Sequence, residues 1–221
     1  MFNYLLINNH YVVNIDEKNY IIDTGSPFSF VRDGSPLVIN NEKFYPNRGM
    51  SEQVYKSISE FVGMNIDGLI GSDIITHTSL TIYKNGQLEF APIESEGHQL
   101  PIHLYGPYSF IPCVLESGDK NLILVDTGAK YGYGDFFKYF SNDKYLRDID
   151  DYNPTLGYFT SKSYEVKINI NNKIYKMELG DHEQVTNWSL RPTNSAAVIN
   201  ITQLFDKYCV FDYNKRMLIY K

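Results

Sequence analysis

The sequence reads Ile21-Ile22-Asp23-Thr24-Gly25-Ser26 near its start and Leu124-Val125-Asp126-Thr127-Gly128-Ala129 much later in the chain, and these two stretches decide its fold. Each is an apolar strand that ends in the triad Asp-Thr-Gly. A single triad arises by chance in roughly one chain in twenty of this length, so one copy would indicate only a surface turn. Two copies indicate more, because a carboxylate that ends a buried strand is costly unless it is paired or hydrogen-bonded. Glycine after Asp-Thr also permits a close backbone approach that a Cβ atom would obstruct.

The chain around the triads repeats one plan. Residues 11–15 and 19–22 have the alternating, β-branched pattern of paired strands, and residues 109–115 and 121–125 repeat it before the second triad. Further matching strands are expected at 38–45, 80–83 and 87–90 in the first half and at 168–175, 208–211 and 217–220 in the second. The first of these in each half is a hairpin that turns at Asn-Asn, a pair that tolerates turn conformations. The sequence therefore predicts an all-β protein built by internal duplication.

Short helices and a boundary complete the predicted organisation. Apolar residues recur at helical spacing over residues 51–62, and a second short helix is expected over 135–140. The polar, proline-containing stretch 92–99 divides the halves. We therefore expect a first lobe at residues 1–93, which carries the Asp23 triad, and a second lobe at 94–221, which carries the Asp126 triad.

Composition excludes several classes of function. Of the 221 residues 43% are hydrophobic and 15% are aromatic, which is enough for a buried core. The net charge is −6, and without an excess of Lys and Arg the chain is not expected to bind nucleic acid. No apolar run approaches the roughly 18 residues that a membrane span needs. The start of the chain lacks a basic leader and a cleavage site, so we expect a cytoplasmic protein.

Side chains that often bind metals do not form a recognisable site in the sequence. The five histidines show no His-x-x-x-His spacing and no cysteine partners at zinc-site intervals, so we expect neither a metal nor a cofactor. Cys113 and Cys209 each lie in an apolar run and are interpreted as buried, reduced thiols. Trp188, the only tryptophan, is expected in the core.

With both triads in view, the sequence resembles the pepsin and retropepsin families of aspartic peptidases. Its pattern is closest to small bacterial retropepsin-like proteins that carry two Asp-Thr-Gly repeats on one chain. Residues 67–75, which read Asp-Gly-Leu-Ile-Gly-Ser-Asp-Ile-Ile, resemble the apolar-apolar-Gly element that lies behind the catalytic turn in these families. The resemblance implies a bilobal acid-protease fold with one catalytic aspartate, Asp23 or Asp126, from each lobe. A monomer is then sufficient to build the active site.

The resemblance also assigns roles to the residues of the two turns. Two carboxylates within a few ångströms share one proton, so one activates a water molecule as general base while the other polarises the peptide carbonyl. Attack gives a gem-diol, and the amide nitrogen leaves after accepting a proton. Which aspartate carries the proton is left open. The threonines, Thr24 and Thr127, would cross-link the turns through hydroxyl-to-backbone bonds, and the glycines, Gly25 and Gly128, would offer N–H groups to the aspartates.

The residue after each triad differs between the halves. We expect the Ser26 hydroxyl to donate to the outer oxygen of Asp23 and favour its ionised form, whereas Ala129 offers no such bond. The sequence therefore predicts a dyad that works nearer neutral pH than one with a hydroxyl on both sides.

Two departures from the family pattern carry expectations of their own. Where the first half has Gly71 and Asp73, the second has Asn200 and Thr202. Asparagine can enter the left-handed region, so either the turn survives or its packing against the second triad is altered.

The second departure concerns the flap, the hairpin that covers the substrate in these families. Residues 32–37 are too short to form a long flap, whereas residues 150–160 hold an Asn-Pro turn, a glycine and aromatics.

These features support a flap supplied by the second half, with Tyr152 or Tyr158 over the cleft; an ordinary surface loop is the alternative. The resulting hypothesis is an aspartic endopeptidase that acts on a peptide or protein substrate. The alternatives are a non-catalytic module of the same fold that binds an extended peptide by strand pairing, and a processing peptidase that cuts one site in one partner.

Overall fold

The computed structural model describes residues 1–46, 49–142 and 144–221. Over these ranges 47% of the chain is β-strand and 15% is helix, so the predicted all-β class is confirmed. The described strands form one ten-stranded, one eight-stranded and one two-stranded sheet. No helix in the described residues is both long and apolar enough to cross a membrane.

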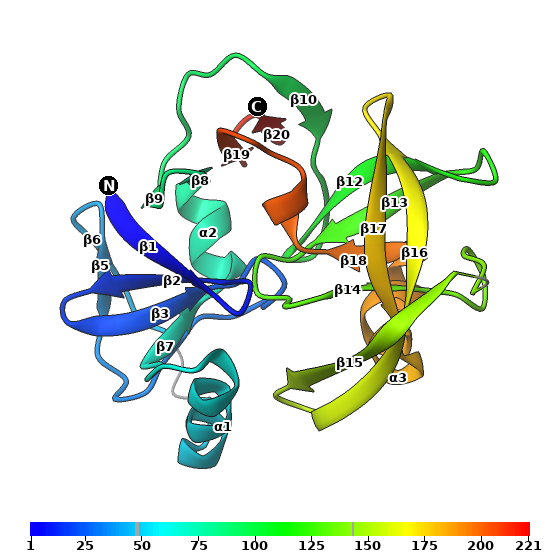
Figure 1. The fold of residues 1–221 in the computed structure, drawn as a ribbon. Coiled ribbons are helices and arrows are strands. Elements are labelled where there is room, and N and C mark those ends of the chain that lie inside the picture. Colours follow the sequence, from blue (N-terminus) through cyan, green and yellow to red (C-terminus); the bar gives the residue numbers. More distant parts are fainter. Residues whose placement is uncertain (47–48, 143) are drawn as a thin grey trace.

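The ten-stranded sheet combines strands from both ends of the chain. In spatial order they are β10 (His98–Pro101), β20 (Met217–Tyr220), β19 (Tyr208–Asp212), β8 (Leu80–Tyr83), β9 (Gln87–Glu89), β1 (Phe2–Ile7), β2 (His10–Ile15), β3 (Lys18–Ile22), β7 (Gly68–Ile70) and β4 (Phe30–Val31). The C-terminal strands therefore continue the sheet that the N-terminal strands begin (Figure 1).

The eight-stranded sheet belongs to the middle and later parts of the chain. In spatial order its strands are β11 (His103–Tyr105), β12 (Tyr108–Leu115), β13 (Lys120–Val125), β18 (Ala197–Ile199), β14 (Gly132–Gly134), β17 (Lys173–Asp181), β16 (Gly157–Ile170) and β15 (Tyr145–Asn153). The two-stranded sheet pairs β5 (Leu37–Ile39) with β6 (Glu42–Phe44).

Pairs of residues with positive φ close several of the hairpins. The turns Asn8-Asn9, Asp16-Glu17, Asn40-Asn41 and Asn171-Asn172 each join two antiparallel strands, and both residues of every pair have φ between 49° and 65°. Two-residue loops of this kind match the right-handed twist of the strands, and Asn and Asp adopt them most readily. The sequence thus fixes the register of these hairpins locally.

The two halves use the same pairing around their triads. In the first half β3 pairs in parallel with β7, and β4 pairs antiparallel to β7. In the second half β13 pairs in parallel with β18, and β14 pairs antiparallel to β18. Each triad follows directly on the strand that has this parallel partner, β3 or β13. Both aspartates therefore lie at the carboxyl end of an inner, buried strand.

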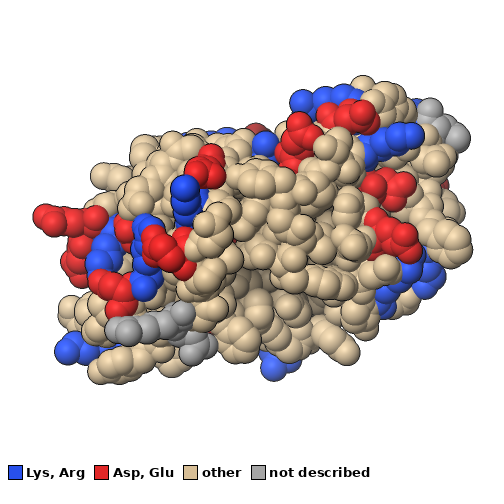
Figure 2. Space-filling view, turned by 90° about the horizontal axis from the view of Figure 1, so that it is seen from below, with Lys and Arg blue, Asp and Glu red and all other residues tan. Residues whose placement is uncertain are grey.

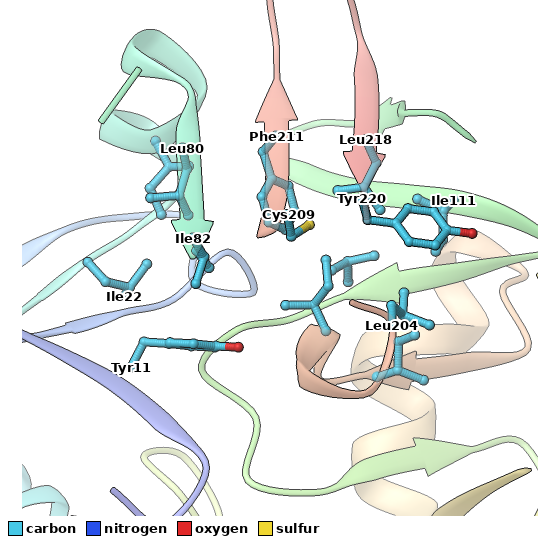
Figure 3. Packing of buried hydrophobic residues seen from close by; sticks show 14 of the residues in the cluster. Tyr11, Ile22, Leu80, Ile82, Ile111, Leu204, Cys209, Phe211, Leu218 and Tyr220 are labelled. Atoms are coloured by element: carbon cyan, nitrogen blue, oxygen red, sulfur yellow. The ribbon is translucent and has the colours of Figure 1, made fainter. Parts of the chain in front are cut away.

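A common apolar core joins the halves. Figure 3 shows side chains of β8, β19 and β20 packed together with residues from β2, β3 and β12. Burial of each such side chain stabilises the fold by about 1.5–3 kcal/mol. The cysteines, Cys113 and Cys209, are free and buried in this core, as predicted.

The helices are short. They are α1 (Glu52–Val62), α2 (Ser72–Thr78), α3 (Glu183–Val185), the π-helical turn Thr186–Leu190 and the 3-10 turns Arg191–Thr193 and Ile201–Gln203. α1 matches the predicted helix at 51–62: the Ser51 side chain accepts from the Val54 N–H, and Gly63 ends the helix with φ 90°.

The predicted helix over 135–140 is wrong. Only one turn forms there, closed by the N–H groups of Lys138 and Tyr139 on the carbonyl of Asp135. Phe136 packs on Tyr164, with ring centroids 4.9 Å apart, and on Phe140 at 5.6 Å. A helix this short is marginal without tertiary support, and here the aromatic contacts hold a turn instead.

Candidate active site

The two threonines of the triads lock the turns to each other. The Thr24 N–H donates to Thr127 Oγ1 at 3.0 Å, and the Thr127 N–H donates to Thr24 Oγ1 at 3.0 Å. Each hydroxyl then donates across the junction, Thr24 to the carbonyl of Val125 at 2.9 Å and Thr127 to that of Ile22 at 2.8 Å. Both threonines are fully buried, so these reciprocal bonds are shielded from water and fix the distance between the turns.

Each glycine of a triad lies against the carboxyl group of the other triad. A Cβ atom on Gly25 would come within 2.2 Å of Asp126 Cγ, and one on Gly128 would come within 2.3 Å of Asp23 Cγ. No side chain fits at either position without displacing a carboxyl group. The two aspartates are thereby brought together at the junction of the halves.

Backbone N–H groups hold both carboxyl groups in place. Asp23 Oδ1 accepts from Gly25 at 2.9 Å and from Ser26 at 2.8 Å, and Asp126 Oδ1 accepts from Gly128 at 2.8 Å. The backbone N–H of Asp23 donates to Ile70 and that of Asp126 to Ile199, both at 2.9 Å. The same geometry in both halves sets the carboxyl groups at the floor of one cleft.

The surroundings of the pair favour retention of a proton. Burial raises the pKa of Asp23 well above its ordinary value, and the neighbouring charge of Asp126 raises it further, against the opposing hydrogen bonds from Ser26 and Gly25. Burial also raises the pKa of Asp126, against the opposing bonds from Asp23 and from backbone N–H groups. Two close carboxylates cannot both ionise readily, so the pair shares a proton and titrates as a unit.

The Ser26 hydroxyl does not contact Asp23, which corrects the expected bond. The hydroxyl donates to the carbonyl of Phe28 at 2.9 Å, and the backbone N–H of Ser26 donates to Asp23 Oδ1 instead. Asp23 Oδ1 already accepts two N–H groups, and the carbonyl of Phe28 accepts the hydroxyl instead. The sequence predicted that this hydroxyl would move the working pH of the dyad toward neutral, and the bond on which that prediction rested does not form. Ala129 follows the second triad and offers only its backbone, as expected.

Asn200 keeps the second turn in place without entering the left-handed region. Its φ is −78°, so the left-handed conformation that asparagine can adopt is not used here. Its Nδ2 donates to the carbonyl of Ala129 at 2.7 Å and to that of Asn9 at 3.0 Å, and its Oδ1 accepts from the Thr202 N–H at 2.9 Å. The backbone around Asp126 is therefore held as it is around Asp23, although the Asn200 side chain lies where the first half has the closely packed Gly71.

A cleft of about 750 Å³ opens above the two aspartates, and both halves line it. Leu69 and Met50 contribute apolar surface from the first half, and Leu124 and Val198 contribute it from the second. Figure 2 shows the face that carries α1 and the β15–β16 hairpin: it is largely uncharged near its middle, and Lys, Arg, Asp and Glu gather mainly toward its ends. The volume suits a peptide-sized ligand held mainly by apolar contacts.

The stretch 150–160 forms a hairpin at the cleft rather than an irregular loop. β15 and β16 pair up to Asn153 and Gly157, and Tyr152 stands directly opposite Tyr158. Tyr152 lines the cleft together with the tip of the hairpin. Tyr158 lies outside the cleft lining, is 59% exposed, and donates to the carbonyl of Ser57 on α1 at 3.4 Å. Of the two candidate flap residues, the structure brings Tyr152 to the cleft.

Three further residues of the cleft wall were not identified from the sequence. Trp188 was expected in the core but is 56% exposed and lines the cleft, because the π-helical turn buries Thr186 and Leu190 instead. Asp151 is buried and accepts from the Tyr133 hydroxyl at 2.6 Å. On β15 the side chains of Ile149 and Asp151 are buried and that of Asp150 between them is exposed, so Asp151 faces inward.

His10 is the third such residue, and it lies beside the second turn. It is 5% exposed, its Nδ1 has no hydrogen-bond partner within the described residues, and burial lowers its pKa to about 4. Hydrogen bonding to the backbone of Asn8, Ile7 and Gly128 opposes this shift, and the charge of Lys130 adds to it. His10 is therefore neutral at neutral pH. Within the described ranges, no group of three or more His, Cys, Asp or Glu side chains is arranged to hold a metal ion.

No family model matches the chain, and no curated protein matches it.

Proposed function

We propose that this protein is an aspartic endopeptidase with a bilobal, pepsin- or retropepsin-like fold that arose by internal duplication. The observation that carries the proposal is the junction of the two triads, in which reciprocal threonine bonds and crossed glycines hold Asp23 and Asp126 together. The matching strand pairings around the two turns support the duplication. Both features come from one chain, so a monomer suffices.

The reaction follows from a carboxyl pair that keeps one proton. The ionised carboxylate takes a proton from a water molecule held between the pair, while the protonated carboxyl donates to the oxygen of the scissile peptide. The C–O bond forms and gives a neutral gem-diol. The carboxyl that took the water proton then gives it to the amide nitrogen, while the other carboxylate takes a proton back from a gem-diol hydroxyl. The C–N bond breaks, the products are a carboxylic acid and an amine, and the pair again holds one proton.

The cleft supports a peptide as the substrate. Its apolar walls take side chains on either side of the dyad, and the outer edge of β15, which pairs on one side only with β16, offers backbone groups to an extended chain. The Asn200 side chain keeps the second turn in the same backbone setting as the first, and this supports catalysis over a non-catalytic binding module.

Cleavage of a peptide library, from about pH 3.5 to about pH 8, tests the proposal. We expect the wild type to cleave, and Asp23→Asn and Asp126→Asn each to lose at least about a thousandfold in kcat/KM, because each removes one member of a unit that acts together. Asp16→Asn is the matched control, since Asn suits the positive φ of that exposed turn. Activity that survives either dyad substitution contradicts the mechanism. Binding of peptides without cleavage by the wild type favours the binding module.

A further inference from the structure

A second pocket lies in the second half, apart from the cleft that holds the two aspartates. Its volume is about 520 Å³, and none of the residues that line it also lines the cleft. One wall comes from the chain that follows β14, and the other comes from the end of β17, α3 and the helical turns after it. Figure 1 shows the chain after β14 running to the edge of the second half, on the side away from the first half.

Asp135 lies at the base of this pocket and is only 3% exposed. Its backbone N–H donates to the carbonyl of Ala196 at 3.0 Å, and its own carbonyl closes the turn at residues 138–139. The carboxyl group has no such partner: Oδ1 accepts no hydrogen bond from the described residues. Oδ2 lies 3.9 Å from Nε of Arg191, which also lines the pocket, and this distance is too long for a hydrogen bond. A buried carboxylate is costly without a donor, so Asp135 favours a cationic donor that enters from the pocket.

Arg191 does not supply that donor, because its guanidinium is held by other groups. Its Nη1 donates to Oδ1 of Asn187, and its Cζ lies 5.9 Å from the centroid of the Phe137 ring. The Arg191 side chain is 44% exposed, whereas that of Asp135 is 4% exposed. The pocket therefore already attracts one cation near solvent, while its deepest carboxyl group is left without a hydrogen bond.

Two exposed carboxyl groups, Asp181 and Glu183, also line the pocket. Burial raises the pKa of Asp181, and the charge of Asp135 raises it further, against the opposing charges of His182 and Lys162. Lys162 stands opposite Asp181 in the β16–β17 register but does not line the pocket. The carboxyl groups thus outnumber the single lining cation, Arg191, and the local field favours a positively charged ligand.

The walls suit an organic cation better than a metal ion. Within the described ranges, no group of three or more His, Cys, Asp or Glu side chains is arranged to hold a metal, so these carboxyl groups do not converge as metal ligands. Phe136 and Phe137 add apolar surface beside them. A primary ammonium group has three N–H donors, enough for Asp135 and for the exposed carboxyl groups, and its carbon chain can lie along the rings.

We propose that this pocket binds an alkylammonium group, a primary amine on a short carbon chain, with the Asp135 carboxylate as its buried counter-ion. A free diamine and the side chain of a lysine share this chemistry. The site does not depend on the proposed peptidase activity, because it shares no lining residue with the cleft.

Amide NMR titration of the whole protein with cadaverine, a diamine, tests the binding. At about 0.15 M ionic strength, which screens attraction to exposed charges, we expect saturable shifts of the amides of residues 135–137 and 181–187. The expected Kd is about 1 mM or lower. Pentanol, which has the same chain length without the charge, is expected to cause no such shifts. The absence of saturable shifts with cadaverine, or equal shifts with pentanol, overturns the proposal.

Two substitutions in the pocket are expected to change the Kd in opposite directions. Asp135→Asn removes the counter-ion and is expected to weaken cadaverine binding at least about tenfold. Arg191→Gln removes the competing cation and is expected to tighten it at least about threefold. Asp16→Asn, which removes one negative charge from a turn of the first half, is the matched control and leaves the Kd unchanged. Equal weakening by Asp135→Asn and Asp16→Asn overturns the proposal.

The Arg191 substitution keeps the proposal testable where Asp135→Asn does not fold, which denaturant unfolding shows. Tighter binding by Arg191→Gln then supports the site, and unchanged or weaker binding overturns it. The source of the amine is distinguished with Nα-acetyl-lysine amide as a second probe. Tighter binding of this probe than of cadaverine supports a lysine side chain, and the reverse order supports a free diamine. Calcium chloride that shifts the same amides while cadaverine does not contradicts the alkylammonium site.

Discussion

The two Asp-Thr-Gly turns reach the same geometry by different contacts. Behind the first turn, the backbone N–H of Ser72 donates to the carbonyl of Ser26 at 2.8 Å, and the Ser72 hydroxyl donates to that of Thr24 at 2.8 Å. Gly71 packs so closely there that a Cβ atom would lie 2.6 Å from the carbonyl oxygen of Phe28. The first turn is thus supported from within its own half, largely by backbone.

Behind the second turn, side-chain amides replace this backbone packing. Asn200 donates to the carbonyl of Ala129, and Asn9 donates through its Nδ2 to the carbonyl of Lys130 at 2.9 Å. Asn9 belongs to the β1–β2 turn of the first half. The second turn therefore depends on a residue of the first half. The two carboxyl groups thus have the same geometry, although different contacts support it in each turn.

Substitution of the crossed glycines tests the part that the turns share. We expect Gly25→Ala and Gly128→Ala each to lower kcat/KM at least about a hundredfold, because the new methyl group displaces the opposing carboxyl group. Each is expected to cost about 1–3 kcal/mol of unfolding free energy through overpacking. Denaturant unfolding and peptide cleavage measure the two effects. If one variant keeps nearly the wild-type kcat/KM while the other loses it, the two glycines are not equivalent, and this result contradicts a symmetric junction.

Replacement of the supporting residues tests the part in which the turns differ. Asn200→Asp removes both donated bonds and buries a new carboxylate, so we expect a loss of about 1–3 kcal/mol in stability and a lower kcat. The corresponding change in the first half, Ser72→Ala, removes one hydroxyl bond and is expected to cost about 1 kcal/mol. Chemical denaturation compares the pair. A larger loss for Ser72→Ala contradicts the assigned support.

His10 gives the second turn an acid sensitivity that sharpens the comparison. Its pKa is about 4 in the folded protein and 6.5 in the unfolded chain. The unfolded chain therefore binds the proton first as the pH falls. The contribution of His10 to stability is fully present above about pH 6.5, and up to about 3 kcal/mol is lost as the pH falls toward 4. His10→Gln is expected to flatten this dependence, and His103→Gln, at an exposed site, leaves it unchanged. Denaturant midpoints across this range that are identical for the wild type and His10→Gln contradict the effect.

The smallest effect is expected at Ser26. Because its hydroxyl donates to Phe28 rather than to Asp23, we expect Ser26→Ala to change kcat/KM by less than threefold and to leave the pH–rate profile in place. The cost in stability is about 1 kcal/mol, the value of one hydrogen bond. A shifted pH–rate profile would indicate that the hydroxyl does interact with Asp23, which is the asymmetry predicted from the sequence.

Local signals account for what the sequence predicted. The Asn-Asn turns at residues 40–41 and 171–172, the helix over residues 51–62 and the strands before each triad depend on neighbouring residues, and all were predicted. The reciprocal threonine bonds followed from the resemblance, and the hydrogen bonds of Thr24 and Thr127 are present.

Contacts between distant residues account for what the sequence missed. The role of Asn200 depends on Asn9, 191 positions earlier, and the position of the hairpin depends on Phe61 of α1. The exposure of Trp188 depends on a π-helical turn that has no periodic signature. The Ser26 hydroxyl donates to the carbonyl of Phe28 rather than to Asp23, and composition and spacing do not determine this partner.

The central claim is that Asp23 and Asp126 form one proton-sharing pair, and carbon-13 NMR titration of the aspartate carboxyl carbons tests it most directly. We expect two coupled transitions for the pair, with one proton retained well above the ordinary aspartate value of 3.8. Asp23→Asn is expected to remove that coupling from Asp126. Two independent transitions near 3.8, unaffected by substitution of the partner, would contradict the account.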